Sequence, residues 1–211
     1  MNTTLQNDEV TGLRFFGKVT ASVTHDVKNS LATINENAGL LTDYAAMAAQ
    51  GKPLDPERVN ALAVRIMDQV KRADGLLKSM NRFAHSVDDS LKKVDLNEIL
   101  QLLAALSVRF AAMAGKTLDV RPSSDPVEIE TSPFGLLNAL FLCLEVAMTA
   151  AGRGRSIDLQ PEKTATGACV HFGPLPDAEI SDQDPCLAAS VDARFVTNTE
   201  AGTLTLIISD R

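Results

Sequence analysis

His25, Asp26 and Asn29 are the residues of this sequence whose types and spacing best suit a chemical reaction. An imidazole is a nucleophile near neutral pH, and a neighbouring carboxylate can accept or orient the proton on its other ring nitrogen. Residues four apart share a helix face, so the Asn29 amide would lie beside His25 and could position a phosphoryl oxygen or a water. The three residues form a candidate phosphoryl-transfer site, unless they are only the polar face of an amphipathic helix.

The segment that carries these residues has the pattern of a long helix, in which apolar residues recur every three or four positions. At roughly 100° per residue, His25 falls about 160° from the centre of the apolar stripe, so its imidazole is expected to face water. The predicted stripe consists of Val23, Val27, Leu31, Ile34, Ala38, Leu41 and Ala45.

A second helix is predicted after a break at residues 50–56, and the whole helical region extends from about residue 10 to 92. Gly51 and the prolines end the first helix, while Asp55 can cap the second with Pro56 at its first position. Two antiparallel helices with one narrow seam each do not form a full core, so the hairpin is expected to dimerise into a four-helix bundle. The second seam comprises Leu62, Ile66, Gln69, Ala73, Leu76, Met80, Phe83 and Val87.

After Val94 the pattern alternates helices with short strands. We predict a helix over 96–114, an apolar helix from Pro133, and strands at 115–120, 127–129, 155–159, 169–172, 194–197 and 203–208, the last two as a hairpin around 200–202. Helices on one face of a mixed sheet would explain this order. The predicted fold class is therefore α+β, with a helical hairpin over 1–93 and an α/β sandwich over 94–211.

The overall composition excludes several functions. A net charge of −7 and a pI near 5 disfavour nucleic-acid binding. The apolar run at 134–151 contains Asn138 and Glu145, which favours a buried core helix over a membrane span. The polar N-terminus lacks a secretion pattern, so a cytoplasmic location is expected.

No metal site is predicted from the spacing of potential ligands along the chain. Cys143, Cys169 and Cys186 are scattered and form no CxxC pair. His85 is interpreted as a surface residue, and His171 as a residue that packs in a strand or faces solvent.

Residues 25–31, His-Asp-Val-Lys-Asn-Ser-Leu, resemble the H-box of two-component histidine kinases. Residues 94–100, Val-Asp-Leu-Asn-Glu-Ile-Leu, resemble the usual join to the kinase ATP-binding domain. The resemblance covers nearly all of the chain and implies that His25 is the phosphoacceptor and Asp26 its general base. It also implies that Asp26 and Asn29 serve a phosphatase reaction on a response-regulator receiver domain, and that the protein is a bacterial homodimer.

The resemblance also implies that the second half is an ATP-binding domain that has lost its site. Glu145 stands at or near the position where the family has an Mg²⁺-binding Asn, and Asn138 matches a non-ligating Asn earlier on the same helix. His171 or Phe172 stands where an adenine-binding Asp is expected, and 180–193 contains none of the glycines that a phosphate-binding lid needs. ATP and Mg²⁺ binding are therefore predicted to be lost, with no cofactor.

Three functions fit these observations. The first is a histidine phosphotransferase that passes phosphate between receiver-domain aspartates through His25 without ATP. The second is a divergent autophosphorylating sensor histidine kinase, which ATP binding would reveal. The third is a non-catalytic dimeric adaptor for a receiver domain or a kinase, in which loss of His25 would leave function intact.

Overall fold

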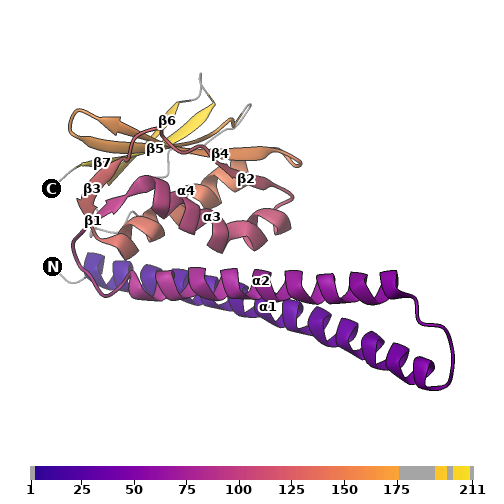
Figure 1. The fold of residues 1–211 in the computed structure, drawn as a ribbon. Helices are drawn as coiled ribbons and strands as arrows, with labels where there is room; N and C mark the ends of the chain where they lie inside the picture. Colours follow the sequence, from indigo (N-terminus) through magenta and orange to yellow (C-terminus); the bar gives the residue numbers. More distant parts are fainter. Residues whose placement is uncertain (1–2, 176–192, 199–201, 210–211) are drawn as a thin grey trace. The chain divides into compact units, whose positions relative to one another are not determined.

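The computed structural model describes residues 3–175, 193–198 and 202–209, with side chains from residue 10 onward (Figure 1). Contacts divide the chain into two compact units. One unit is Thr20–Met80, and the other consists of Met1–Val19 together with Asn81–Arg211. The boundary that the sequence predicts at residue 94 therefore lies inside the second unit, which also includes the first part of the first helix and the end of the second.

Helices α1, Thr3–Ala49, and α2, Pro56–His85, form the predicted hairpin. Helix α1 starts earlier than the expected residue 10. It ends at a turn in which Gly51 has a φ of 79° and Lys52 N donates to Met47 O at 3.1 Å, the bonding of a glycine-terminated helix. Asp55 Oδ1 accepts from Glu57 N at 3.0 Å, so the predicted break and N-cap are confirmed.

The face of α1 that packs in the hairpin differs from the predicted stripe. Leu31 is 55% exposed, and Ala38 and Ala45 are also exposed, whereas Ser30 and Asn37 are buried. Asn37 tolerates burial because its Nδ2 donates to Thr33 O at 2.6 Å. The apolar positions of α1 are spread over more than one helix face, and the buried stripe lies one residue earlier than Leu31 and Ala38. These members of the predicted seam are therefore not covered within one chain. The seam is wrong at Val87, which follows the end of α2 and is 52% exposed.

The rest of the chain alternates strands and helices. In order, these are β1 Lys92–Asp95, α3 Leu96–Met113, β2 Thr117–Val120, β3 Glu128–Thr131, α4 Pro133–Ala150, β4 Ser156–Thr164, β5 Gly167–Gly173, β6 Ala193–Asn198 and β7 Thr203–Ser209. The larger sheet has the order β2-β4-β5-β7-β6, in which only β2 and β4 are parallel. The predicted mixed sheet and its terminal strand pair are confirmed, whereas β1, paired with β3, was not predicted.

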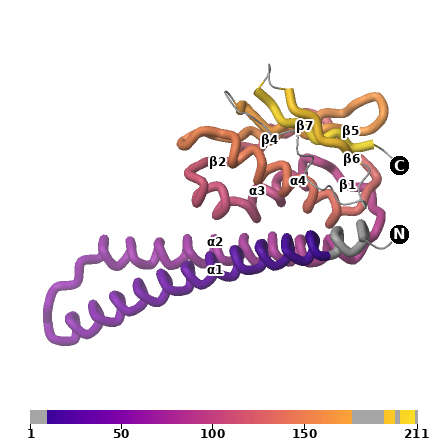
Figure 2. The backbone as a smooth tube through the Cα atoms, turned by 180° about the vertical axis from the view of Figure 1, so that it is seen from behind, coloured from indigo at the N-terminus to yellow at the C-terminus, as the bar shows by residue number. Residues whose placement is uncertain are grey.

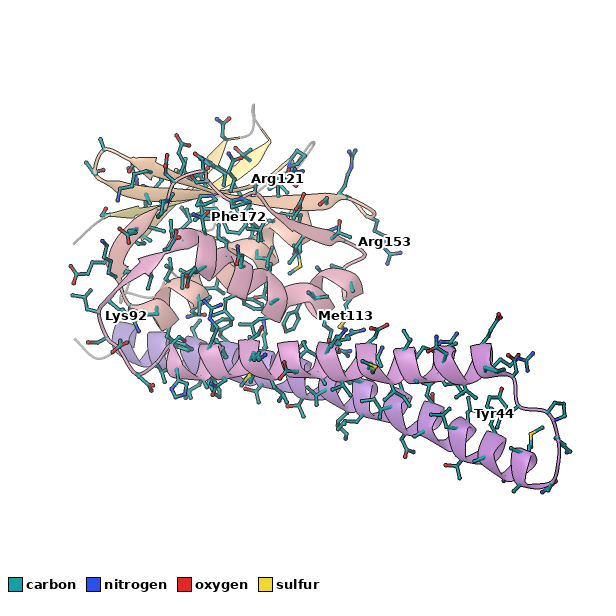
Figure 3. All side chains as sticks on the ribbon, in the orientation of Figure 1. Tyr44, Lys92, Met113, Arg121, Arg153 and Phe172 are labelled. Carbon is teal, nitrogen blue, oxygen red and sulfur yellow. The ribbon has the colours of Figure 1, made fainter. Side chains whose placement is uncertain are left out.

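Helices α3 and α4 cover one face of this sheet (Figures 1 and 2). The side chains of each strand alternate between the two faces. Phe172, for example, is fully buried within the α/β core (Figure 3). The inner face is formed by Ile157, Leu159, Pro161, Ala168, Val170, Phe172, Leu204, Leu206 and Ile208, all buried. This helix-on-sheet packing confirms the predicted α/β sandwich.

Within the described part of the chain, two helices are long and apolar enough to cross a membrane by length and composition. They are α3 and α4, of which 44% and 61% are buried within the structure. Most of α4 supplies the core of the α/β layer, as expected for the core helix of a folded domain.

Candidate functional site

The structure places His25, Asp26 and Asn29 together on α1, within the unit Thr20–Met80. The His25 side chain is 48% exposed and that of Asp26 is 13% exposed. Asn29 is also exposed, one helical turn after His25. The imidazole is therefore accessible to a partner, while the carboxylate beside it is largely shielded from water.

Asp26 and Asn29 both approach the same ring atom of His25. Asp26 Oδ1 lies 3.3 Å from Nδ1, and Asn29 Nδ2 lies 3.2 Å from it. A carboxylate only accepts hydrogen bonds, whereas the Nδ2 of an amide only donates. A protonated Nδ1 therefore donates to Asp26, and an unprotonated Nδ1 accepts from Asn29.

This shared contact lets the two neighbours select the tautomer of the imidazole. In the state in which Nδ1–H donates to Asp26, the lone pair is on Nε2, which is then the nucleophilic atom. The carboxylate also stabilises the positive charge that an imidazole acquires when Nε2 forms a new bond. The arrangement thus suits nucleophilic attack from Nε2.

Glu145, at the position that the resemblance assigns to Mg²⁺ binding, is paired with a lysine. Lys18 Nζ lies 2.7 Å from Glu145 Oε1 and 5.7 Å from the centre of the Phe141 ring. Both charged side chains belong to the unit that combines Met1–Val19 with Asn81–Arg211. An ammonium group at this carboxylate competes with a divalent cation for its negative charge.

A hydrophobic cluster holds this part of α1 against α4. The Phe15 ring lies 4.9 Å from Phe141, 5.8 Å from Phe134 and 5.1 Å from Phe83, centre to centre. Asn138 is buried beside a cavity of about 190 Å³, and its Oδ1 has no hydrogen-bond partner among the residues that the structure describes. The α4 surface near Glu145 is thus partly occupied by the chain itself.

His171 and Phe172 do not supply a substitute for an adenine-binding carboxylate. Phe172 is fully buried in the core, and His171 is on the opposite face of β5, where its Nε2 lies 2.9 Å from Glu162 Oε2. Of the predicted lid segment 180–193, only Ala193 belongs to the described residues.

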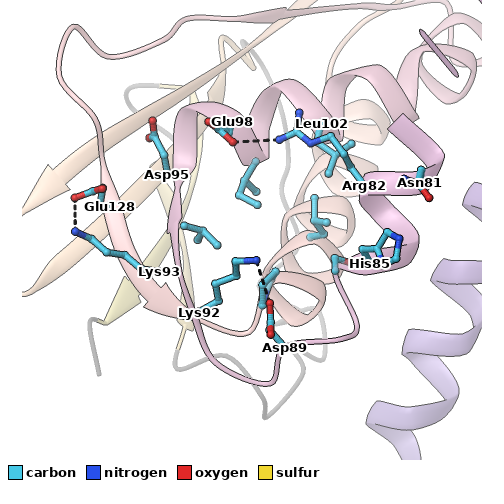
Figure 4. Close-up of a pocket in the computed structure, with 15 residues that line it drawn as sticks. Asn81, Arg82, His85, Asp89, Lys92, Lys93, Asp95, Glu98, Leu102 and Glu128 are labelled. Atoms are coloured by element: carbon cyan, nitrogen blue, oxygen red, sulfur yellow. Dashed lines mark hydrogen bonds and ion pairs between the residues drawn. The ribbon is translucent and has the colours of Figure 1, made fainter. Parts of the chain in front are cut away.

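A larger cavity, of about 490 Å³, lies between the end of α2, β1 and the start of α3 (Figure 4). Most of the charged side chains that line it form ion pairs with one another. Arg82 lies 3.2 Å from Glu98, Lys92 lies 3.0 Å from Asp89, and Lys93 lies 2.6 Å from Glu128. His85, on the same wall, contacts Asp88 at 2.7 Å. Because charges of both signs neutralise each other here, the cavity has no clear preference for a charged ligand.

The strands bring together one group that the sequence spacing did not reveal, namely Glu162, Cys169 and His171. Their ligand atoms all lie within 4.8 Å of one another. Burial, and to a lesser extent the Glu162 carboxylate, raise the pKa of the Cys169 thiol. Cys169 is therefore not an activated nucleophile. The group becomes visible only once the register of β4 against β5 is known, because that register places Glu162 opposite Cys169.

No family model and no curated protein sequence matches this chain. In total, 126 solved chains match it in structure, and those described here are histidine kinases or parts of them. The Acinetobacter baumannii histidine kinase AdeS is 11% identical, with 82% of this chain and 94% of that chain covered and a TM-score of 0.46.

Two further matches differ in how much of the chain they cover. Histidine kinase ThkA, solved in complex with the response regulator protein TrrA, is 14% identical over 100% of this chain and 67% of its own, with a TM-score of 0.45. The ATP-binding domain of PrrB from Mycobacterium tuberculosis is 18% identical over 58% of this chain and 99% of its own, with a TM-score of 0.43. Such low identities and TM-scores leave the chemistry of this chain to be argued from its own residues.

Proposed function

We propose that this protein is a dimeric histidine phosphotransferase of a two-component phosphorelay, which carries phosphate between receiver-domain aspartates on His25 without using ATP. The observation that supports this proposal most directly is the half-exposed imidazole whose Nδ1 is shared by Asp26 and Asn29. A reactive group on an open helix face suits a protein partner, because small substrates are usually bound in concave pockets.

The proposed reaction transfers one phosphoryl group and requires no other reactant. His25 Nε2 attacks the phosphorus of an aspartyl phosphate on the receiver, forming an N–P bond as the P–O bond to the aspartate breaks. The receiver carboxylate is the leaving group, and Nδ1–H remains hydrogen-bonded to Asp26. The reverse reaction passes the phosphoryl group to a second receiver.

Two contacts on the surface of α4 favour a reaction that does not use ATP. Lys18 neutralises Glu145 at 2.7 Å, and Phe15 packs on Phe141 beside that pair. Nucleotide phosphates that approach an Mg²⁺ ion there would have to displace both contacts. We therefore propose that the second half of the chain serves as a structural domain and not as a kinase domain.

Two phosphate donors distinguish this function from an autokinase. Incubation with radiolabelled Mg-ATP should leave the protein unlabelled, whereas incubation with labelled phosphorylated receivers from the same genome should give an acid-labile, alkali-stable label. Labelling by ATP alone would instead identify a kinase. If neither donor labels the chain, an adaptor becomes the better explanation.

The hairpin has an apolar face that a second copy would cover. Leu31 and Ala38 on α1, and Val70 and Leu77 on α2, are exposed, with Leu31 and Leu77 each 55% exposed. Each lies one residue after a buried or half-buried position of its helix. When a hairpin is viewed from one end, successive residues turn clockwise on one helix and anticlockwise on the other, because the two chains run in opposite directions. A step of one residue from the packed face therefore leads to the same side of the hairpin on α1 and on α2. We propose that this side is the homodimer interface.

Such a dimer leaves the reactive face accessible. At 100° per residue, Leu31 lies about 160° around the helix from Asn29, two residues earlier. It lies about 120° around the helix from His25, six residues earlier. A receiver domain could therefore reach His25 without opening the dimer.

Leu77→Glu should convert the dimer into a monomer. Losing two buried leucine side chains per dimer, at about 1.5–3 kcal/mol each, should weaken dimerisation by roughly 10²- to 10⁴-fold, before the cost of burying the carboxylates. Sedimentation equilibrium measures this change. Arg72→Gln alters the net charge equally at another exposed position of α2 and should leave the dimer intact. A wild-type protein that sediments as a monomer at micromolar concentration would contradict the proposed interface.

A further inference from the structure

Glu162, Cys169 and His171 converge on the outer face of the larger sheet, opposite the face that packs on α3 and α4. Glu162 on β4 pairs directly with Cys169 on β5, and His171 follows two residues later on the same face. His171 Nε2 lies 2.9 Å from Glu162 Oε2 and 3.4 Å from Cys169 Sγ. One imidazole nitrogen, one carboxylate oxygen and one sulfur therefore lie within 4.8 Å of one another.

These separations are close to those of ligands around one tetrahedral metal ion. With metal–ligand distances of about 2.05 Å for nitrogen and oxygen and about 2.3 Å for sulfur, tetrahedral ligands are about 3.4 Å (N to O) and about 3.6 Å (N or O to S) apart. The two observed distances from His171 Nε2 differ from these values by about 0.5 Å or less, and the carboxylate and the sulfur lie within 4.8 Å of each other. A metal ion at this site would require rotations of the side chains that bring the carboxylate and the sulfur to tetrahedral positions.

Thr205 provides the support that a metal-binding imidazole normally has. Its Oγ1 lies 2.9 Å from His171 Nδ1, the ring nitrogen that faces away from the cluster. When Nδ1–H donates to this hydroxyl, the lone pair of Nε2 points at the carboxylate and the sulfur.

We propose that Glu162, Cys169 and His171 bind a zinc ion through Oε2, Sγ and Nε2, with Thr205 orienting the imidazole. A mixed sulfur, nitrogen and oxygen set suits this borderline-soft ion, and three protein ligands leave a fourth position for water. Glu162 is exposed and the His171 side chain is 33% exposed, so the ion can enter from solvent. These ligands and His25 belong to different compact units.

Zinc binding can be tested on the tag-free 211-residue chain after chelator treatment and dialysis. Calorimetry with Zn²⁺ should show one ion per chain, and Co²⁺ should give a thiolate-to-metal charge-transfer band. At a Zn²⁺ concentration about 100 times Kd, Tm should rise by roughly 5–10 °C. The proposal fails if Zn²⁺ does not bind at up to millimolar concentration, or if the cobalt complex shows no thiolate band.

Variants assign the ligands. Cys169→Ser, His171→Gln and Glu162→Gln should each lower zinc affinity at least tenfold, and Thr205→Val should lower it about 10- to 100-fold. Since Glu162 is exposed, Glu162→Gln is expected to fold even if the Cys169 variant does not. His85→Gln is the matched control, because His85 also contacts a carboxylate but belongs to no such group among the described residues. Wild-type affinity in Glu162→Gln and Thr205→Val, or a loss in His85→Gln, would overturn the assignment.

Discussion

His25→Gln is expected to abolish uptake of phosphate from a phosphorylated receiver, with a loss of at least about 10³-fold in the initial rate. Transfer requires a nitrogen lone pair that can form a bond to phosphorus. The lone pair of a glutamine amide is delocalised into its carbonyl, so the variant retains polarity and similar length but no nucleophile. Because the side chain is 48% exposed, the fold should tolerate the change. The rate of acid-labile labelling measures the effect.

His85→Gln provides the matched control for that experiment. His85 is also an exposed helical histidine beside a carboxylate, with Nδ1 2.7 Å from Asp88 Oδ2. The proposed function assigns it no role, so its variant should take up label at the wild-type rate. Equal labelling of His25→Gln and wild type would show that another residue accepts the phosphate.

Asp26→Asn is expected to slow phosphate transfer by about 10²-fold without abolishing it. Asp26 Oδ1 lies 3.3 Å from Nδ1 and accepts from it in the tautomer whose nucleophile is Nε2. An asparagine has no negative charge to stabilise the imidazolium, and in one orientation its amide donates to Nδ1 and favours the unreactive tautomer. Single-turnover transfer measures the chemical step without contributions from receiver turnover.

Two further variants separate the role of Asp26 from a general charge effect. Asp43→Asn removes the same charge from another exposed position on α1 and should leave the transfer rate unchanged. Asn29→Ala removes the amide 3.2 Å from Nδ1 and should slow hydrolysis of the receiver phosphate more than transfer to His25. If Asp43→Asn slows transfer as much as Asp26→Asn, the carboxylate acts through long-range electrostatics and not through Nδ1.

The sequence predicted the geometry of the candidate site because that geometry is local. His25 and Asn29 are one turn apart, so helical periodicity alone places them together. The break between the helices could be predicted for the same reason, since Gly51 and Asp55 act on neighbouring backbone groups. The packing face of α1 could not be predicted with equal accuracy. Periodicity shows which residues share a face, but not which of two apolar faces meets α2.

Contacts between residues that are distant in the sequence could not be predicted from the sequence pattern. Lys18 and Glu145 are 127 positions apart, and no periodicity links them. The group of Glu162, Cys169 and His171 depends on the register of β4 against β5, where a shift of one residue would turn one strand's side chains to the opposite face. Strand β1 was missed because its four residues pair with β3 from a short polar segment, Lys92–Asp95, that has no alternating pattern.

A reconstituted relay tests the proposed function most directly. A labelled phosphorylated donor receiver, a trace amount of this protein and an unphosphorylated acceptor receiver are mixed in a buffer without nucleotide. We expect label to appear on the acceptor only when the wild-type protein is present, and to pass through a transient phosphohistidine that His25→Gln does not form. Transfer to the acceptor at the same rate with wild type and with His25→Gln would contradict the proposed role of His25.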